Sequence, residues 1–188
     1  MDDLKIIERC LLGNREEFSK LIDKYKSMVY NLTYRMCNNL DDAEDLSQEA
    51  FLRAFQSLSR FNPSYKFSTW LYQITLNIVR DRFKKKSLNC LSLDTPIETD
   101  DSEIYLQHPN SDHANNPEEA FSRKEKSKSI EKAILSLPLT YREVIVLRHL
   151  QNFSYSEISS ILKIPASIVK VRLFRGRQAL KKNLLNSR

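Results

Sequence analysis

The chain has 188 residues and a formal net charge of +6, a length that suits one or two small domains with cores of their own. With only 2 glycines and 6 prolines, the composition favours helices over a turn-rich β fold. The 3 cysteines lie far apart, which excludes a disulfide framework and a zinc site as expectations. The sequence has neither a signal peptide nor an apolar run long enough to span a membrane, which predicts a cytoplasmic protein with no direct membrane insertion.

Charge is distributed unevenly along the chain. Residues 1–93 carry 15 basic and 12 acidic side chains. Residues 94–120 carry 8 acidic side chains and no basic one, and residues 121–188 carry 15 basic and 4 acidic side chains. Basic segments attract phosphate backbones, although a charge-rich face is often simply solvated. The acidic middle is rich in Pro, Asp, Asn and Ser and has no apolar periodicity, which predicts a flexible linker at 89–116. Two domains, 1–88 and 117–188, are expected on either side.

The first predicted helix runs from about Arg15 to Cys37. Its apolar residues recur at steps of three and four, so that one stripe faces a core. Asn14, with Glu17 three residues later, is a candidate cap for its start. The members of the stripe are Phe18, Leu21, Ile22, Tyr25, Val29, Leu32 and Met36.

A second helix is predicted to start at Asp41 or Asp42, whose carboxylates suit a helix N-terminus. Its buried stripe consists of Ala43, Leu46, Ala50 and Ala54, flanked by Phe51, Phe55 and Leu58. A different face contains Asp45, Gln48, Glu49 and Leu52 at helical spacing. Three polar groups beside one leucine are compatible with a solvated face and with a docking face.

Five of the chain's 18 aromatic residues fall between Phe61 and Tyr72, at the start of a third predicted helix. The loop Arg60–Lys66 contains Pro63, which bars helix continuation, and the helix opens at Ser68 or Thr69. Its inner stripe is Leu71, Ile74 and Ile78, and its opposite stripe is Trp70, Gln73, Asn77, Arg80 and Lys84. The opposite stripe has the groups that stack on bases, bond their edges and contact phosphates. The alternative is that Trp70 completes the core and the others are solvated.

The second half predicts a helix-turn-helix. A helix is expected from Pro117 toward Leu137, with Pro138 ending it. Two capping boxes, Thr140-x-x-Glu143 and Ser154-x-x-Glu157, predict helices at Tyr141–Leu150 and Tyr155–Leu162. A turn at Lys163–Ala166 then leads to a basic helix. Its core-facing residues are Val169, Leu173, Gly176 and Leu180, and its outward residues are Val171, Phe174, Arg175 and Gln178, flanked by Lys170 and Arg177.

This arrangement matches a motif whose second helix enters the major groove of DNA. An ordinary basic terminal helix on a small bundle is the alternative. The fold class expected from all these segments is all-α, with two helical domains.

The order and spacing of these segments resemble a bacterial RNA polymerase sigma factor of the extracytoplasmic-function (ECF) type, over nearly the whole chain. The segment DAEDLSQEAFLRAF resembles the part of the sigma second region that docks on core RNA polymerase, and RFNPSYKFSTWLY the part that opens the promoter and captures minus-ten bases. The resemblance implies polymerase contacts by Asp45, Gln48, Glu49 and Leu52. It implies contacts with minus-ten DNA by Arg60, Asn62, Lys66, Phe67, Ser68, Thr69, Trp70, Gln73, Asn77, Arg80 and Lys84.

The C-terminal half resembles the fourth region, which reads the minus-thirty-five element. The implied DNA-binding residues are Lys170, Val171, Arg172, Phe174, Arg175 and Arg177. Where the family usually has Gly-Thr-Val-Lys-Ser-Arg, this chain has Ser-Ile-Val-Lys-Val-Arg at 167–172, so Ile168 and Val171 supply no hydroxyl donors. The family also implies three partners, namely core RNA polymerase, promoter DNA and an anti-sigma factor.

No catalytic constellation is found in the sequence. A Gly-rich phosphate loop, a metal-ligand set and a nucleophile motif are all absent, so we expect no catalytic residue, no metal, no cofactor, no small-molecule substrate and no enzyme activity. A stand-alone helix-turn-helix repressor or activator is the alternative to a sigma factor.

Overall fold

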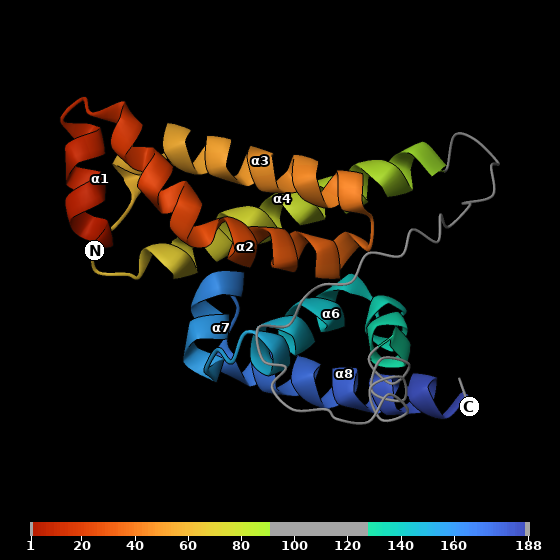
Figure 1. Ribbon diagram of the computed structural model, residues 1–188. Helices are drawn as coiled ribbons and strands as arrows, with labels where there is room; N and C mark the ends of the chain where they lie inside the picture. Colours follow the sequence, from red (N-terminus) through yellow and green to blue (C-terminus); the bar gives the residue numbers. More distant parts are fainter. Residues whose placement is uncertain (1, 91–127, 187–188) are drawn as a thin grey trace, which may run out of the picture.

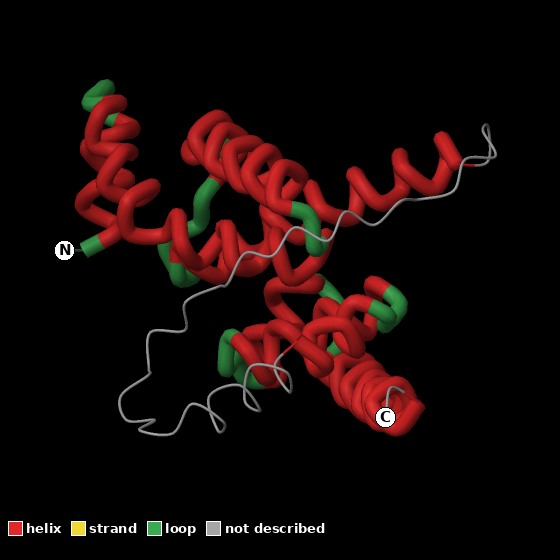
Figure 2. The backbone as a smooth tube through the Cα atoms, turned by 45° about the vertical axis from the view of Figure 1, so that its right-hand side comes forward, coloured by secondary structure: helices red, strands yellow, loops and turns green. Residues whose placement is uncertain are grey.

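The computed structural model describes residues 2–90 and 128–186. Every regular element in these two ranges is a helix, which confirms the all-α fold class (Figure 2). Helices α1 to α4 form one layer and α6 to α8 form a second layer against it (Figure 1). Nearly all of the predicted linker at 89–116, and the predicted helix start at Pro117, lie outside the described residues.

The first helix, α1 (Asp3–Leu11), is an element that the periodicity did not predict. Its N-cap is Asp2, whose side chain accepts a hydrogen bond from the backbone N–H of Leu4 at 3.3 Å. Ile6, Ile7 and Cys10 are its buried residues, so a short apolar stripe holds it on the bundle.

The helix predicted at Arg15–Cys37 forms as a 3₁₀ turn, η1 (Arg15–Glu17), followed by α2 (Phe18–Cys37). The prediction that Asn14 caps it is wrong, because the Asn14 side chain makes no capping bond and the Asn14 backbone carbonyl accepts from the N–H of Glu17 at 3.1 Å instead. α2 ends at Asn38, whose φ of 53° is left-handed and whose N–H donates to the Tyr34 carbonyl at 2.8 Å.

Helix α3 (Leu40–Gln56) starts slightly before its predicted position. Asn39 is the cap, since its side chain accepts from the N–H of Asp42 at 2.8 Å. The predicted buried stripe is confirmed by Ala43, Leu46, Ala50 and Ala54. Between α2 and α3, the buried hydroxyls of Thr33 and Ser47 lie 2.9 Å apart, so these two polar groups satisfy each other inside the core.

Helix α4 (Phe67–Cys90) follows a 3₁₀ turn, η2 (Leu58–Arg60), and is buried on more than its predicted inner stripe. Leu71 and Ile78 are buried as expected and Ile74 is half-buried. Tyr72, Leu76 and Val79 are buried as well. Part of this additional burial comes from the second layer, because Tyr72 contacts Phe153 and Gln151 there.

The second layer contains helical residues 128–135, α6 (Leu139–Ile145), a π-helical turn η3 (Val146–Leu150), α7 (Tyr155–Leu162) and α8 (Ala166–Asn186). The capping box at Ser154 is confirmed, with both reciprocal bonds to Glu157 present. The capping box at Thr140 is wrong. Pro138 occupies the cap position of α6 without a side-chain bond, and Glu143 points instead toward α4.

Helix α8 lies tightly on α6. Val169 and Leu173 are 0% and 1% exposed, which confirms the predicted core-facing arc. Gly176 belongs to the same arc, and a Cβ built there would lie 3.1 Å from Cγ1 of Ile145. Gly176 therefore permits a close approach of the two helices.

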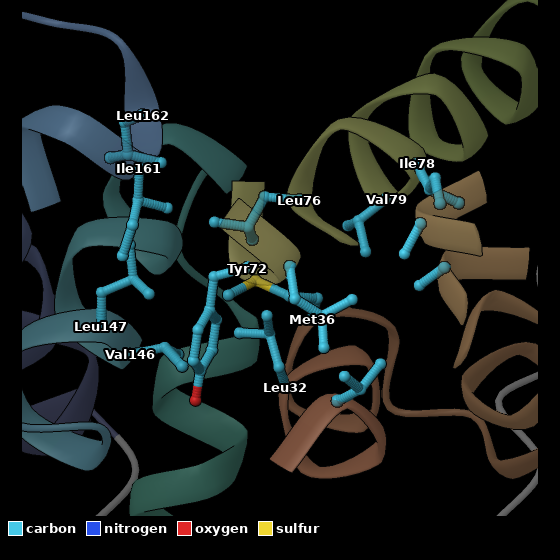
Figure 3. Close-up of a cluster of buried hydrophobic side chains, with 14 of the residues drawn as sticks. Leu32, Met36, Tyr72, Leu76, Ile78, Val79, Val146, Leu147, Ile161 and Leu162 are labelled. Atoms are coloured by element: carbon cyan, nitrogen blue, oxygen red, sulfur yellow. The ribbon is translucent and has the colours of Figure 1, made fainter. Parts of the chain in front are cut away.

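The two layers share one apolar core (Figure 3). Tyr72 and Leu76 of α4, with Leu32 and Met36 of α2, lie in the same buried cluster as Val146, Leu147, Ile161 and Leu162 of the second layer. The Tyr72 ring meets the Phe153 ring edge-on, with centroids 4.9 Å apart. The two parts of the chain are thus packed against each other.

Candidate functional site

The predicted docking face of α3 is largely open to solvent. Asp45 and Gln48 are exposed, and Leu52, an apolar side chain, is 56% exposed. Glu49 is half-buried and pairs with Arg53 at 2.5 Å. The structure therefore brings the four predicted residues onto one accessible helix face.

A surface hollow of about 570 Å³ lies beside this face, between α2 and α3. Sequence reasoning did not find the α2 side of the hollow. A signal was present in Tyr30, an aromatic ring that falls outside the predicted apolar stripe of α2. The residues that line the hollow are Ile22, Lys26, Ser27, Tyr30, Asn31, Glu44, Ser47, Gln48 and Phe51.

The loop before α4 divides into exposed and buried members of the predicted minus-ten set. Arg60, Asn62 and Lys66 are exposed, and the Asn62 side chain accepts from the N–H of Ser64 at 2.9 Å. Phe67 and Thr69 are 2% and 9% exposed, so in this structure they shape the loop from inside. Ser68 is half-buried.

The aromatic cluster at Phe61–Tyr72 is mainly a core junction. The Trp70 ring is half-buried against Phe61 and Phe67, with centroid distances of 5.3 and 5.6 Å. Tyr65, by contrast, is 57% exposed. Tyr65 is therefore an aromatic side chain of the loop that is accessible for stacking, although the predicted residue set did not include it.

The polar stripe of α4 is engaged with the second layer at its centre. Arg80 donates from Nε and Nη2 to the two carboxylate oxygens of Glu143, at 2.6 and 2.9 Å. Glu143 is only 1% exposed, and hydrogen bonding to it raises the pKa of Arg80. Asn77 accepts from Nη1 of Arg80 at 3.3 Å. Gln73 is half-buried and Lys84 is exposed.

Further polar contacts join the two layers around this ion pair. The Tyr72 hydroxyl donates to Oε1 of Gln151 at 2.7 Å, and burial raises the pKa of Tyr72, which keeps the hydroxyl protonated. Nζ of Lys66 lies 3.4 Å from Oε1 of Glu157 in α7.

Arg142 of α6, which sequence reasoning missed, is 9% exposed and donates to the backbone carbonyls of Met36, at the end of α2, and Leu135. The lost contact with water lowers the pKa of Arg142. These contacts tie the end of α2 to the second layer.

The outward face of α8 is accessible. Val171, Phe174 and Arg175 are exposed as predicted, and so is Lys170. Within the described residues, neither Lys170 nor Arg175 makes a hydrogen bond or ion pair.

Two further cations of α8 are held more closely. Arg177 donates from Nε to Nε2 of His149 at 3.2 Å. The pKa of His149 is lowered by burial and by Arg177 and Arg148, so the imidazole stays neutral and can accept that bond. Arg172 is half-buried.

Among the described residues, no cluster of His, Cys, Asp or Glu side chains has the makings of a metal site. Over the same part of the chain, no helix is both long enough and apolar enough to span a bilayer.

Comparisons with known proteins assign the class. Residues 21–88 match the family described as Sigma-70 region 2, and residues 127–180 match Sigma-70 region 4. The chain therefore has the two-region organisation of a sigma factor, with α3 and α4 in region 2 and α7 and α8 in region 4.

The relatives narrow the class to a family. The ECF RNA polymerase sigma factor SigW of Bacillus subtilis is 41% identical over 181 residues, covering 96% of this chain and 95% of the relative. The ECF sigma-E factor of Escherichia coli K12 is 30% identical over 180 residues, covering 96% of this chain and 93% of the relative. The chain belongs to the ECF sigma factors.

Two solved structures share the fold. CnrH, in complex with the cytosolic domain of CnrY, has a TM-score of 0.66 at 22% identity and covers 97% of this chain and 96% of its own. RpoE of Bartonella quintana, in complex with the anti-sigma factor NepR, has a TM-score of 0.70 at 21% identity and covers 92% and 99%.

Proposed function

We propose that this protein binds core RNA polymerase, directs it to specific promoters and helps to open the DNA for transcription initiation. The observation that carries the proposal is that both sigma regions are present in order, each with an exposed helix face of suitable chemistry. It acts by binding in the cytoplasm rather than by catalysis. The first domain, 1–88, would bind polymerase and the minus-ten element, and the second, 117–188, would bind the minus-thirty-five element. The segment 89–116 connects the two domains.

The face of α3 made by Asp45, Gln48, Glu49 and Leu52 is the proposed polymerase contact. Its exposed leucine supplies apolar area and its three polar groups lie beside that leucine along the helix, a mixture of apolar and polar side chains that suits a protein–protein interface. The neighbouring hollow between α2 and α3 offers room for side chains of the partner.

The loop before α4 and the polar stripe of α4 are the proposed minus-ten site. Arg60, Asn62 and Lys66 are accessible there, and Arg80 and Lys84 supply cations farther along the helix. The buried Phe67 and Thr69 hold the loop in shape. On α8, Lys170 and Arg175 are free to contact the minus-thirty-five element.

An anti-sigma factor is the proposed regulator. RpoE of Bartonella quintana, which shares the fold, forms a complex with an anti-sigma factor. We propose that a protein of this kind holds the present chain until a signal releases it.

Run-off transcription with core polymerase across genomic fragments tests the proposal. Discrete transcripts that depend on the protein are expected. Tight binding to duplex DNA without polymerase, together with no transcripts, would favour the stand-alone repressor instead.

The polymerase contact has its own test. Gln48→Ala should weaken association with core polymerase in a titration, while Gln56→Ala, an exposed glutamine at the end of the same helix, should not. Equal affinity of the two variants would remove the α3 face from the mechanism.

A further inference from the structure

The outward face of α8 carries an apolar strip. Two of its residues, Ile168 and Val171, stand where the family usually has the hydroxyl-bearing residues Thr and Ser, which would offer hydrogen bonds. Ile168, Val171 and Phe174 are 41%, 46% and 64% exposed. They follow one another at steps of three residues, so they are neighbours on the helix surface. A row of large apolar side chains in water is unfavourable, which indicates that another apolar surface covers it in function.

Cations lie on both sides of this strip. Projected at about 100° per residue, Arg172 lies beyond Ile168 at one edge, and Lys170 and Arg177 lie beyond Phe174 at the other. Arg175 projects within the strip, between Ile168 and Val171. A major groove has the complementary layout, with phosphates along both rims and base edges in the middle. The strip therefore occupies the part of the helix that would face the base edges.

Packing on the opposite side of α8 fixes the direction in which the strip faces. Val169 and Leu173 are 0% and 1% exposed against the second-layer core, so α8 cannot roll to hide its outward face without losing that packing. Successive members of the strip are about 4.5 Å apart along the helix axis, against a rise of about 3.4 Å per base pair, so the three side chains span about the length of two to three base-pair steps. Neighbouring side chains can thus meet neighbouring base pairs.

We infer that Ile168, Val171 and Phe174 read thymine methyl groups in the major groove of the upstream promoter element, an inference that rests on the proposed function. The C5-methyl of thymine is the apolar group that a base pair presents in that groove, whereas the other base edges present hydrogen-bond donors and acceptors. An aliphatic or phenyl side chain placed against an amino or carbonyl edge leaves that edge unsatisfied. The strip therefore favours thymine at the positions it covers and disfavours cytosine there.

The experiment uses the full-length protein with core RNA polymerase. Duplexes with a randomised upstream segment are enriched for binding, and the enriched segment is copied with either dTTP or dUTP before it is joined to unchanged downstream DNA. Uracil pairs as thymine does but lacks the methyl group. The comparison thus removes every upstream methyl group, whatever the sequence of the promoter.

The wild-type protein should bind the thymine pool more tightly than the uracil pool. Each buried methyl contributes about fourfold, so loss of two or three contacts should cost about 15-fold to 60-fold. Val171→Thr, which replaces one methyl by a hydroxyl at equal size, and Phe174→Ala should each reduce the thymine-to-uracil affinity ratio. Leu185→Ala, at another exposed apolar residue of α8 (61% exposed), should leave the ratio unchanged.

Two results would overturn the inference. Equal affinity for the two pools, with sequence enrichment intact, refutes methyl reading and leaves the sigma function standing. A thymine preference that persists unchanged in Val171→Thr and Phe174→Ala would arise from a property of the DNA itself and not from contacts with the strip. If no upstream segment is enriched by the polymerase complex, the proposed function fails together with the inference.

Discussion

The two helices that carry the proposed DNA contacts, α4 and α8, differ in what surrounds their cations. On α4, Arg80 is bound by both oxygens of a carboxylate from the other domain, and Lys66 in the preceding loop faces Glu157 of α7. On α8, Lys170 and Arg175 have no partner within the described residues. The centre of the polar stripe of α4 is thus covered by the second domain, whereas the outward face of α8 is not covered.

This difference shows that part of the proposed minus-ten surface is engaged by the second domain in this conformation, whereas the proposed surface on α8 is open. The bidentate pair with Glu143 holds the Arg80 guanidinium against the second domain, so Arg80 has to leave Glu143 before it can turn fully toward a phosphate. Arg175 needs no such movement. Under the proposed function, Arg80 would contact promoter DNA only after the domains separate, whereas Arg175 would be accessible in the packed state.

The largest expected effect comes from breaking the ion pair on the α4 side. Arg80→Ala leaves Glu143, 1% exposed, as an unpaired buried carboxylate, which costs about 3 kcal/mol and favours separation of the domains. Small-angle scattering should report a larger radius of gyration. Arg82→Ala is the matched control because its partner, Asp42, lies in the same domain. An unchanged radius in Arg80→Ala would contradict the assignment.

On the α8 side, Arg175→Ala should weaken promoter binding and leave the domain packing unchanged. A cation that reads a base contributes about 1–3 kcal/mol to binding. Footprinting with the polymerase complex measures the loss of upstream occupancy. Lys182→Ala, at another exposed cation near the end of α8, is the control. Full occupancy with Arg175→Ala would show that the side chain is not used.

Ser154→Ala should destabilise α7 by about 1 kcal/mol, because it removes a confirmed N-cap. The pKa of Glu157 is lowered by the backbone N–H of Ser154 and also by the Ser154 hydroxyl, which donates to Oε2 of Glu157 at 2.8 Å. The variant keeps the N–H and loses the hydroxyl, so the hydroxyl's part of the stabilisation is complete above the ordinary value of 4.5 and is lost as pH falls through the lowered pKa. Urea denaturation at neutral and acid pH should show the variant's deficit shrinking in acid. A deficit independent of pH would point to another cause.

The smallest effect is expected from Tyr72→Phe. The ring and its contact with Phe153 remain, and only the hydrogen bond to Gln151 is lost. Because Gln151 is half-buried and can turn toward water, the packing between domains should weaken by about 1 kcal/mol or less. Fluorescence transfer between labels on the two domains would detect the shift. A change as large as that of Arg80→Ala would contradict the ranking.

Two motifs of the same type show how far the sequence could predict this structure. Ser154-x-x-Glu157 is a capping box as predicted, since all of its partners lie within one turn. At Thr140-x-x-Glu143 the same reasoning failed, because Pro138 starts the helix and Arg80, 63 residues away, takes the carboxylate. Local periodicity fixes which face of a helix is apolar. It cannot reveal a partner on another domain.

The site shows the same limit. The outward face of α8 was predicted well, because burial of Val169 and Leu173 decides it within one helix. The polar stripe of α4 was predicted from one helix alone, but Gln73 and Arg80 are half-buried and Arg80 is bonded to Glu143 of the second layer. Arg142, which ties the two layers together, gave no sequence signal, since a lone arginine in an apolar helix has no periodic partner.

The close contact at Gly176 also determines how far α8 stands out from the body of its domain. A glycine in the middle of a helix costs about 0.5–1 kcal/mol relative to alanine, yet a Cβ at this position would press on Ile145. A methyl group there would require the Ile145 side chain or α8 itself to shift by a few tenths of an ångström. The absence of one methyl group on its hidden side thus lets the helix that carries the proposed DNA-reading face sit close on its own domain.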